Sequence, residues 1–160
     1  LYESLRFSNV STYIQSGNVV FQSKDSNPVA IASSIEKAIE KAYGFSVPIV
    51  LRRPDDFRKV ISKCPFLISA EADESRLYVT FLKSRPAPSL VRAIAPIAVK
   101  TKDTYKISGG EVYLHCPNGY GKTVFSNNYF EKHLKVTATT RNWNTVQTLL
   151  AMSNSSEGLT

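Results

Sequence analysis

The chain has 160 residues, 42% hydrophobic and 21% charged, which suffices for one ordinary domain or two small ones. This composition excludes wholesale disorder, and no apolar run reaches the ~18–20 residues of a membrane span. Two cysteines, Cys64 and Cys116, make no disulfide framework, so we expect reduced thiols and a cytoplasmic location. No secretory signal opens the sequence, and the absence of an initial Met predicts a fragment of a longer protein.

The net charge of +7 is unevenly distributed. Residues 1–75 contain 9 Lys and Arg against 9 Asp and Glu, whereas residues 76–160 contain 11 against 4. A basic second half predicts an anionic partner, and the alternative is a soluble surface that is basic without any partner.

The first half predicts strands and helices in alternation. Residues 1–7 are typical of the end of a helix, and apolar residues alternate with polar ones over 10–15. In chain order there follow a turn at 16–18, a strand at 19–22, a helix from Asn27-Pro28 to Gly44, a β-branched strand at 47–51 and a helix at 55–64.

The second half begins after a polar, acidic stretch at 69–75. Its first strand, 77–82, is apolar on nearly both faces, which is typical of a central strand. In chain order there follow a helix at 89–94, a hairpin of 104–108 and 111–115, a Gly-containing loop at 117–122, a helix from Ser126 to Leu134, a strand at 136–140, and a helix to about Met152 capped by Asn142 or Asn144.

Two stretches about ninety residues apart resemble each other. Each has a Tyr-x-x-Ser-Gly turn followed by an apolar run and, further on, a Val five residues before an Arg. The shared positions are Tyr13–Gly17 and Tyr105–Gly109, then Val47 with Arg52 and Val136 with Arg141.

This repeat predicts an α+β fold, a tandem duplication of ferredoxin-like (βαββαβ) units that each carry a trailing helix. We expect a first half at 1–70, a second, basic half at 71–152 and a frayed tail at 153–160. The first half lacks its N-terminal strand, which in this topology lies in the middle of the sheet and would leave backbone groups unpaired. We expect a segment before Leu1 to supply this strand. If the molecule starts at Leu1, we expect another chain to supply it, in a homodimer or by strand exchange.

The sequence gives little support for a metal or a cofactor. His115 and Cys116 are adjacent in a strand, so their side chains point to opposite faces and cannot form a dyad. His133 is the only other histidine and no Cys-x-x-Cys spacing occurs, so we expect no zinc site and no cofactor. The simplest role for the cysteines is as small buried residues.

The string Gly119-Tyr120-Gly121-Lys122-Thr123 has part of a phosphate-binding pattern. The full pattern needs a glycine where Cys116 stands. Backbone N–H groups ahead of a helix attract anions, so Lys122 and the loop amides form a candidate anion site. The alternative is a Gly-rich turn that lets the chain reverse.

The strand pattern offers a second candidate, a base-stacking platform. If Leu77 and Val79 face the helices, Tyr78 faces out, and Tyr113 and His115 face out by the same reasoning. Such a platform would bind nucleic acid, although the aromatic-rich signature of RNA-recognition modules is absent. The alternative is that the open sheet faces are covered.

The cluster Arg141-Asn142-Trp143 is the third candidate. With Tyr120 and Lys122 it could clamp an anionic or planar ligand in a pocket between the halves. In the structural alternative Asn caps the helix, Trp143 covers the seam between elements and Arg141 pairs with a carboxylate. Arg52 at the equivalent position of the first copy favours that alternative.

Three strings, at 12–21, 119–123 and 138–146, resemble the bacterial family catalogued as domain of unknown function 1697. The resemblance implies a cytoplasmic protein of two ferredoxin-like halves. It also implies an N-terminal strand followed by an Arg-Gly-Ile-Asn-Val-Gly-Gly-type loop, which this chain lacks. Arg6 stands where the family tends to have glycine. The family has no established activity, so the resemblance implies no catalytic residues.

These observations favour a non-enzymatic binding module that recognises an anionic partner, with nucleic acid as one candidate, through its basic second half. An enzyme or small-ligand protein with a pocket between the halves is the competing hypothesis, and a structural or self-associating protein is the third. No partner in a membrane is expected.

Overall fold

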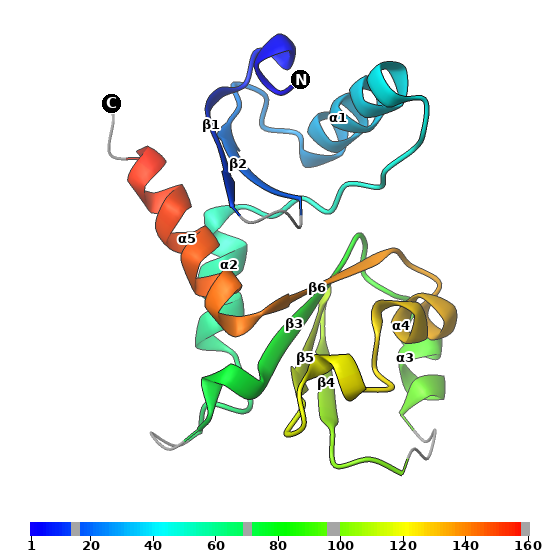
Figure 1. Cartoon of the computed structure of the whole chain (residues 1–160). Helices are drawn as coiled ribbons and strands as arrows, with labels where there is room; N and C mark the ends of the chain where they lie inside the picture. The colour runs from blue at the N-terminus through cyan, green and yellow to red at the C-terminus, as the bar shows by residue number, and fades with distance from the viewer. Residues whose placement is uncertain (14–16, 69–71, 96–99, 158–160) are drawn as a thin grey trace. The chain divides into compact units, whose positions relative to one another are not determined.

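The structure is a computed structural model that describes residues 1–13, 17–68, 72–95 and 100–157. In these residues the fold is α+β, with two antiparallel sheets and five α-helices (Figure 1). The chain divides into two compact units: unit 1, Leu1–Arg58 with Gln147–Thr160, and unit 2, Lys59–Val146. The halves predicted from the sequence repeat, 1–70 and 71–152, have other boundaries than these units, and they remain a prediction. No helix in the described residues is both long and apolar enough to cross a membrane.

Unit 1 opens with a 3-10 turn, Glu3–Leu5, and a β-hairpin. Strand β1 (Ser8–Tyr13) pairs antiparallel with β2 (Asn18–Gln22), close to the predicted positions. A register shift between Ser8 and Ser11 marks a bulge, where Asn9 has φ 49°. Residues 14–15 of the predicted strand and residue 16 of the predicted turn lie outside the described residues.

Helix α1 (Pro28–Tyr43) has the boundaries that its sequence predicts. The Asn27 side chain accepts hydrogen bonds from the N–H groups of Val29 and Ala30, and Gly44 ends the helix at φ 77°. Its apolar face packs a small core of Phe7, Ile31 and Ile35.

Residues 47–51 are not a strand in the structure, so this prediction is wrong. Pro48 has no N–H to donate, and no described strand pairs with this segment. Ile49 and Leu51 nevertheless pack against the core around α1, and the Ile49 N–H donates to the Glu36 carboxylate at 2.7 Å. This segment therefore packs against the core of unit 1 without pairing with a described strand.

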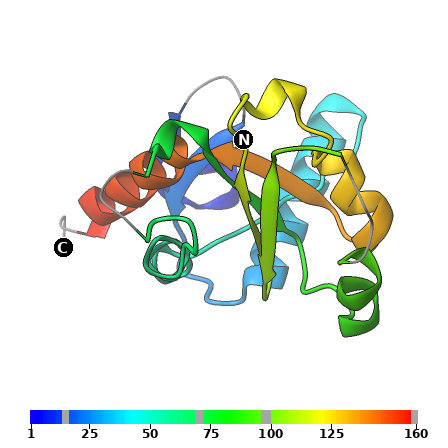
Figure 2. The ribbon, with the colours of Figure 1, turned by 90° about the horizontal axis from the view of Figure 1, so that it is seen from below.

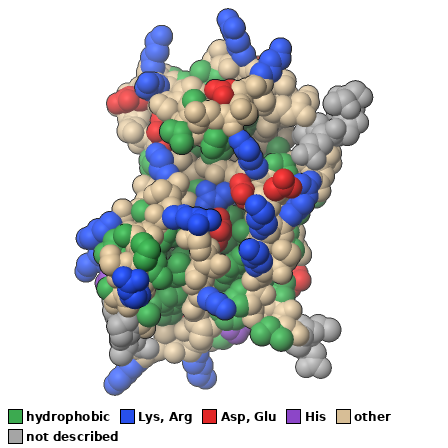
Figure 3. All heavy atoms as spheres, turned by 180° about the vertical axis from the view of Figure 1, so that it is seen from behind, with side chains coloured by type: hydrophobic (Ala, Val, Ile, Leu, Met, Phe, Trp, Pro, Cys, Tyr) green, Lys and Arg blue, Asp and Glu red, His purple; other side chains and the backbone are tan. Residues whose placement is uncertain are grey.

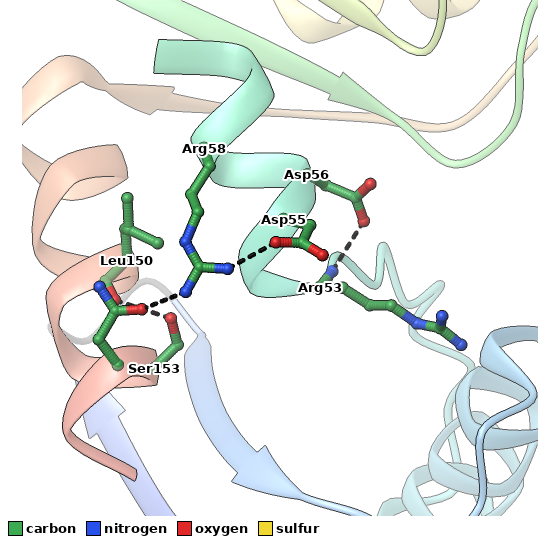
Figure 4. Close-up of polar contacts among 7 residues, drawn as sticks. Arg53, Asp55, Asp56, Arg58, Leu150 and Ser153 are labelled. Carbon is green, nitrogen blue, oxygen red and sulfur yellow. Dashed lines mark hydrogen bonds and ion pairs between the residues drawn. The ribbon is translucent and has the colours of Figure 1, made fainter. Parts of the chain in front are cut away.

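Helix α2 (Pro54–Ser62) begins with carboxylates, as predicted. The Arg53 N–H donates to Asp56 at 2.8 Å, and Arg58 pairs with Asp55 at 2.5 Å (Figure 4). Arg58 also donates to Asn154 at 2.7 Å. Asn154 belongs to α5 (Trp143–Glu157), which continues beyond the predicted end near Met152.

Unit 2 contains the larger sheet. Its strands are β3 (Leu77–Leu82), β4 (Thr104–Ser108), β5 (Glu111–His115) and β6 (Ala138–Asn142). The order is β4-β5-β3-β6 with every pair antiparallel, so β3 lies in the interior of the sheet as predicted (Figure 2). β6 begins two residues later than expected.

One face of this sheet packs against α3 (Pro88–Ile94) and α4 (Asn127–Leu134). The core there buries apolar side chains from the strands, both helices and the segment before α4. They are Leu82, Ile94, Val112, Leu114, Cys116, Phe125, Phe130, Leu134 and Ala138. Ser126 caps α4 through a hydrogen bond from the Tyr129 N–H, as its sequence predicts.

Two local contacts occur in both units. Glu131 of α4 accepts from the Ala138 N–H at 2.9 Å, as Glu36 of α1 accepts from the Ile49 N–H. Arg141 donates to the carbonyl of the residue before it at 2.9 Å, and Arg52 does the same at 2.9 Å. The segment after each helix is therefore held to it in the same way.

Candidate functional site

The register of unit 2 separates the residues predicted to form a stacking platform. Tyr78 pairs with Leu114, whereas Val79 pairs with Tyr113 and Leu77 with His115. Since side chains alternate along a strand, Tyr78 lies on the α3/α4 face while Tyr113 and His115 lie on the other face. The predicted orientation of β3 is thus reversed, and these three side chains do not share one surface.

Tyr113 is also buried, with 3% of its surface exposed. Burial raises its pKa to about 12, and the nearby Glu111 and Cys64 act in the same direction. The Phe66 and His115 rings lie 5.9 Å apart, so residues that follow α2 cover this part of the sheet. A base could not stack on Tyr113 in this conformation.

Tyr120 lies on the α3/α4 face, next to Tyr78, with 5.3 Å between the ring centroids. Its hydroxyl donates to the Thr140 Oγ1 at 3.2 Å. Tyr120 belongs to a 3-10 turn, Tyr120–Lys122, that follows β5. The aromatic ring therefore holds the Gly-containing loop against the sheet.

Thr140 is the centre of a polar network that sequence reasoning missed. Its Oγ1 donates to the Asn127 Oδ1 at 2.6 Å and lies 2.7 Å from the Thr80 Oγ1. A hydroxyl has one hydrogen, so Thr80 and Tyr120 must both donate to Thr140. Thr80 is fully buried at 0% exposure. The sequence signal for this network was Thr80, a single threonine inside the apolar run 77–82.

The Gly119–Thr123 loop departs from a phosphate-binding loop in its connection to the helix. In that motif the Gly-Lys pair opens the helix, but here α4 begins at Asn127, five residues after Lys122. Gly119 has φ 87°, and a Cβ there would lie 3.5 Å from the Arg76 guanidinium. The Lys122 N–H donates to the Gly119 carbonyl at 3.4 Å, so the exposed side chain is the part of Lys122 that could contact an anion.

The Arg141–Trp143 cluster has structural contacts. Burial lowers the pKa of Arg141, which donates to the Thr139 Oγ1 at 2.6 Å. The Asn142 side chain accepts from the Thr145 N–H at 2.8 Å and so caps α5, one of the two caps predicted. Trp143 is 1% exposed. Asn142 thus meets the capping role that the sequence left open as the alternative to a ligand clamp, whereas Arg141 donates to a threonine hydroxyl and a backbone carbonyl.

A pocket lined by all five of its predicted residues is not supported. Arg141 pairs with Val79 and so lies on the face opposite Tyr120, which contacts Thr140. Trp143 is interior. Lys122 and Asn142 remain exposed. Of the described side chains, no three from His, Cys, Asp and Glu are grouped so that they could hold a metal ion.

Basic side chains are the remaining candidates. Figure 3 shows more Lys and Arg than Asp and Glu on the face it presents. In unit 2, Lys102 precedes β4, Lys106 lies within it and Lys122 follows β5, and all three are exposed. Thr104 pairs with His115, so the start of β4 lies beside the end of β5. We call Lys102, Lys106 and Lys122 the β4 lysines.

These features define a class, α+β proteins with two antiparallel sheets. More narrowly, the chain belongs to the family described as "Protein of unknown function (DUF1697)", whose profile matches residues 1–113. The resemblance seen in the sequence strings is thereby confirmed.

A solved structure has a similar fold. It is described as the conserved bacterial protein SP0830 from Streptococcus pneumoniae, with a TM-score of 0.71 and 21% sequence identity. The similarity covers 94% of this chain and 83% of that one. At this identity it supports the fold alone. The chain matches no protein with a curated description.

Proposed function

We propose that the protein is a non-enzymatic cytoplasmic module that binds an anionic partner, nucleic acid being the first candidate, through the β4 lysines. The observation that carries this proposal is that Lys102 and Lys106 are exposed at the edge strand β4, while Lys122 is exposed in the loop that follows β5. Free Cys64 and Cys116 fit a reducing compartment.

Three of the four carboxylates of the basic half are buried or have a partner of their own, which supports the proposal. Asp103 is buried at 8% exposure, and Glu131 accepts from the Ala138 N–H. Glu111 also has an interaction partner. The β4 lysines form no ion pair with another residue in the described parts of the chain. Their charge therefore remains available to phosphate groups.

The expected mode of binding follows from the buried Tyr113. Without a stacking surface on the sheet, the lysines would contact phosphate groups and read no base edges. We expect affinity that depends strongly on salt and little on sequence.

The test is to measure the affinity for labelled single-stranded RNA and DNA by fluorescence anisotropy. The KCl concentration is varied from about 50 to 200 mM, a range over which phosphate contacts change the affinity strongly. Each phosphate contact with a single strand contributes ~0.7 to the slope of log K against log salt. Replacing the β4 lysines together (Lys102→Gln, Lys106→Gln, Lys122→Gln) should lower that slope by about 2 and weaken binding about tenfold or more.

The matched control carries charge changes at the other end of the sheet. Lys132 and Lys135 lie at the end of α4, which precedes β6, and Ala138 of β6 pairs with Leu82, the last residue of β3. Lys132→Gln with Lys135→Gln should leave the slope nearly unchanged. Salt-independent binding, or equal losses in the two sets of variants, would contradict the proposed surface.

We also infer that the chain is a duplicated ferredoxin-like unit. The Glu–backbone and Arg–carbonyl contacts common to both units support this, as does the β3-α3-β4-β5-α4-β6 order of unit 2. Gly17 and Gly109, at equivalent turns, both have positive φ, 77° and 62°.

A further inference from the structure

We propose that unit 2 binds single-stranded nucleic acid by stacking one unpaired base on the Tyr120 ring, with phosphate groups on Arg76 and Lys122. We call these three side chains the Tyr120 site. The inference rests on the proposed function, because Lys122 is one of the β4 lysines. It adds the class of nucleic acid, an aromatic contact and a further cation.

The Tyr120 ring is an outer layer on the sheet of unit 2. Tyr78 is one of the partly buried side chains that pack against the α3/α4 core. Tyr120 lies on Tyr78, with 5.3 Å between the ring centroids and 33° between the ring planes. Tyr120 is itself partly exposed, and no other ring in the described parts of the chain contacts it. One face of the Tyr120 ring therefore meets Tyr78 while the other points away from it.

The orientation of the ring is fixed at two points. The Tyr120 hydroxyl donates to the Thr140 Oγ1 at 3.2 Å. The Tyr120 carbonyl accepts from the Thr123 N–H at 3.1 Å. A ring that is already held in place loses little conformational entropy when a base stacks on it, so binding is favoured.

The neighbours of Tyr120 in the chain are glycines, which have no side chain to cover the ring. A Cβ on Gly121 would meet nothing within 4 Å. A Cβ on Gly119 would lie 3.5 Å from the Arg76 guanidinium. The loop is therefore open at Gly121, and a cation borders it at Gly119.

Cations flank Tyr120 on both sides along the chain. Arg76 lies against Gly119, and exposed Lys122 follows Tyr120 by two residues. Arg76 pairs with Asp73 at 3.7 Å, and the two side chains are 44% and 60% exposed. An ion pair so open to water is weak, so a phosphate group can replace Asp73 as the partner of the guanidinium. An aromatic ring between two cations is complementary to a nucleotide, which has a planar base and a charged phosphate.

The fitting ligand is a strand with unpaired bases. In a duplex the faces of each base are covered by the neighbouring base pairs, so a duplex would meet only the cations of the site. A single strand leaves its bases free to stack on aromatic side chains. Stacking accepts every base because each has a π-face, which agrees with the weak sequence dependence expected above.

The probes are three labelled oligonucleotides of about 12 nucleotides. The first is a single strand, the second is the same strand in a duplex, and the third is a strand of abasic sites, which keeps the phosphates and lacks the bases. Fluorescence anisotropy with the full 160-residue chain measures each affinity. The single strand with bases should bind about tenfold more tightly than the abasic strand, because one stacked base contributes about that factor.

Variants of Tyr120 separate the ring from its hydroxyl. Tyr120→Leu should weaken binding of the single strand about tenfold and leave the abasic strand and the duplex unchanged. Tyr120→Phe also lacks the hydroxyl but keeps the ring, so its affinity should stay within about twofold of the original. The matched control is Tyr43→Leu, which removes a tyrosine of unit 1 that is 63% exposed and should change no affinity. Arg76→Gln should lower the slope of log K against log salt by ~0.7, as expected for one phosphate contact.

The outcomes distinguish this inference from the proposed function. Equal binding of the strands with and without bases would overturn the Tyr120 site, and this comparison needs no variant, so it holds even if Tyr120→Leu does not fold. Equal losses in Tyr120→Leu and Tyr120→Phe, or a loss with the duplex as large as with the single strand, would also overturn it. In each of these cases the β4 lysines keep their role if their replacement lowers the salt slope. If their replacement leaves the slope unchanged, the proposed function fails and this inference fails with it.

Discussion

Thr140→Val should destabilise the protein by about 2 kcal/mol, although valine has nearly the same shape as threonine. The substitution removes the acceptor of the Thr80 hydroxyl, which has 0% exposure and cannot turn to water. An unsatisfied buried hydroxyl costs ~1–3 kcal/mol. Asn127, which is half-buried, also loses its hydrogen-bond donor.

Replacing both threonines provides the sharper comparison. In Thr80→Val with Thr140→Val, the buried hydroxyl that lacked an acceptor is gone, so the double variant should be more stable than the sum of two single losses by about 1 kcal/mol. Tyr120→Phe should cost only ~0.5–1 kcal/mol, because its 3.2 Å bond is long and the ring remains packed on Tyr78.

Urea unfolding measured by tryptophan fluorescence suits this cycle. Trp143 is the single tryptophan and is 1% exposed within unit 2, so its emission reports the packing of the unit that contains the network. The m-values of the variants should match that of the original chain. Strictly additive losses, or a Thr140→Val variant as stable as the original chain, would refute the proposed hydrogen-bond directions.

Three further outcomes follow from single sites. Tyr113 should titrate near pH 12 when absorbance is followed at alkaline pH, and this transition should be lost in Tyr113→Phe. The pKa of tyrosine in the unfolded chain is about 10. The contribution of Tyr113 to stability is therefore complete below pH 10 and is lost as the pH rises toward 12. Glu131→Ala should cost about 1 kcal/mol in urea unfolding by leaving the Ala138 N–H unpaired, whereas Glu131→Gln keeps an acceptor and should cost less. Gly109→Ala should cost about 1 kcal/mol because φ is +62°, and Gly121→Ala, with open space and no left-handed φ, should be nearly neutral in the same assay.

Elements with local signals could be predicted from the sequence. The cap at Asn27 and the stop at Gly44 delimit α1 through contacts within a few residues, and the two hairpins follow from alternation and turn chemistry. The strand predicted at residues 47–51 is absent because a strand depends on contacts that are not local. β-branched residues favour an extended chain, but a strand also needs a neighbour, and no local pattern shows whether one is present.

The face of β3 could not be chosen from its sequence. Residues 77–82 are apolar at both parities, so alternation assigns neither face to the helices. The two faces are filled by distant segments: Tyr78 packs with the α3/α4 core, whereas Tyr113 on the other face lies near Cys64. Because the side chains of β3 have the opposite orientation to the predicted one, Tyr78 does not share a face with Tyr113 and His115, and the predicted stacking platform does not form. By contrast, the local cap at Asn142 could be foreseen.

The place to seek a function is where the two copies differ without a packing reason. Between the second hairpin strand and the helix, the first copy has residues 23–26 and the second has 116–125, which include the Tyr120–Lys122 turn. Tyr120 serves the polar network, but exposed Lys122 contributes to no described core. Aligning Tyr13 with Tyr105 places Lys102 opposite Val10, which packs in the core of unit 1. A partly buried apolar position of the first copy thus corresponds to an exposed cation in the second, and the inserted loop adds a further exposed cation, Lys122. Folding requires neither change, so both are better explained by a partner with negative charge than by architecture.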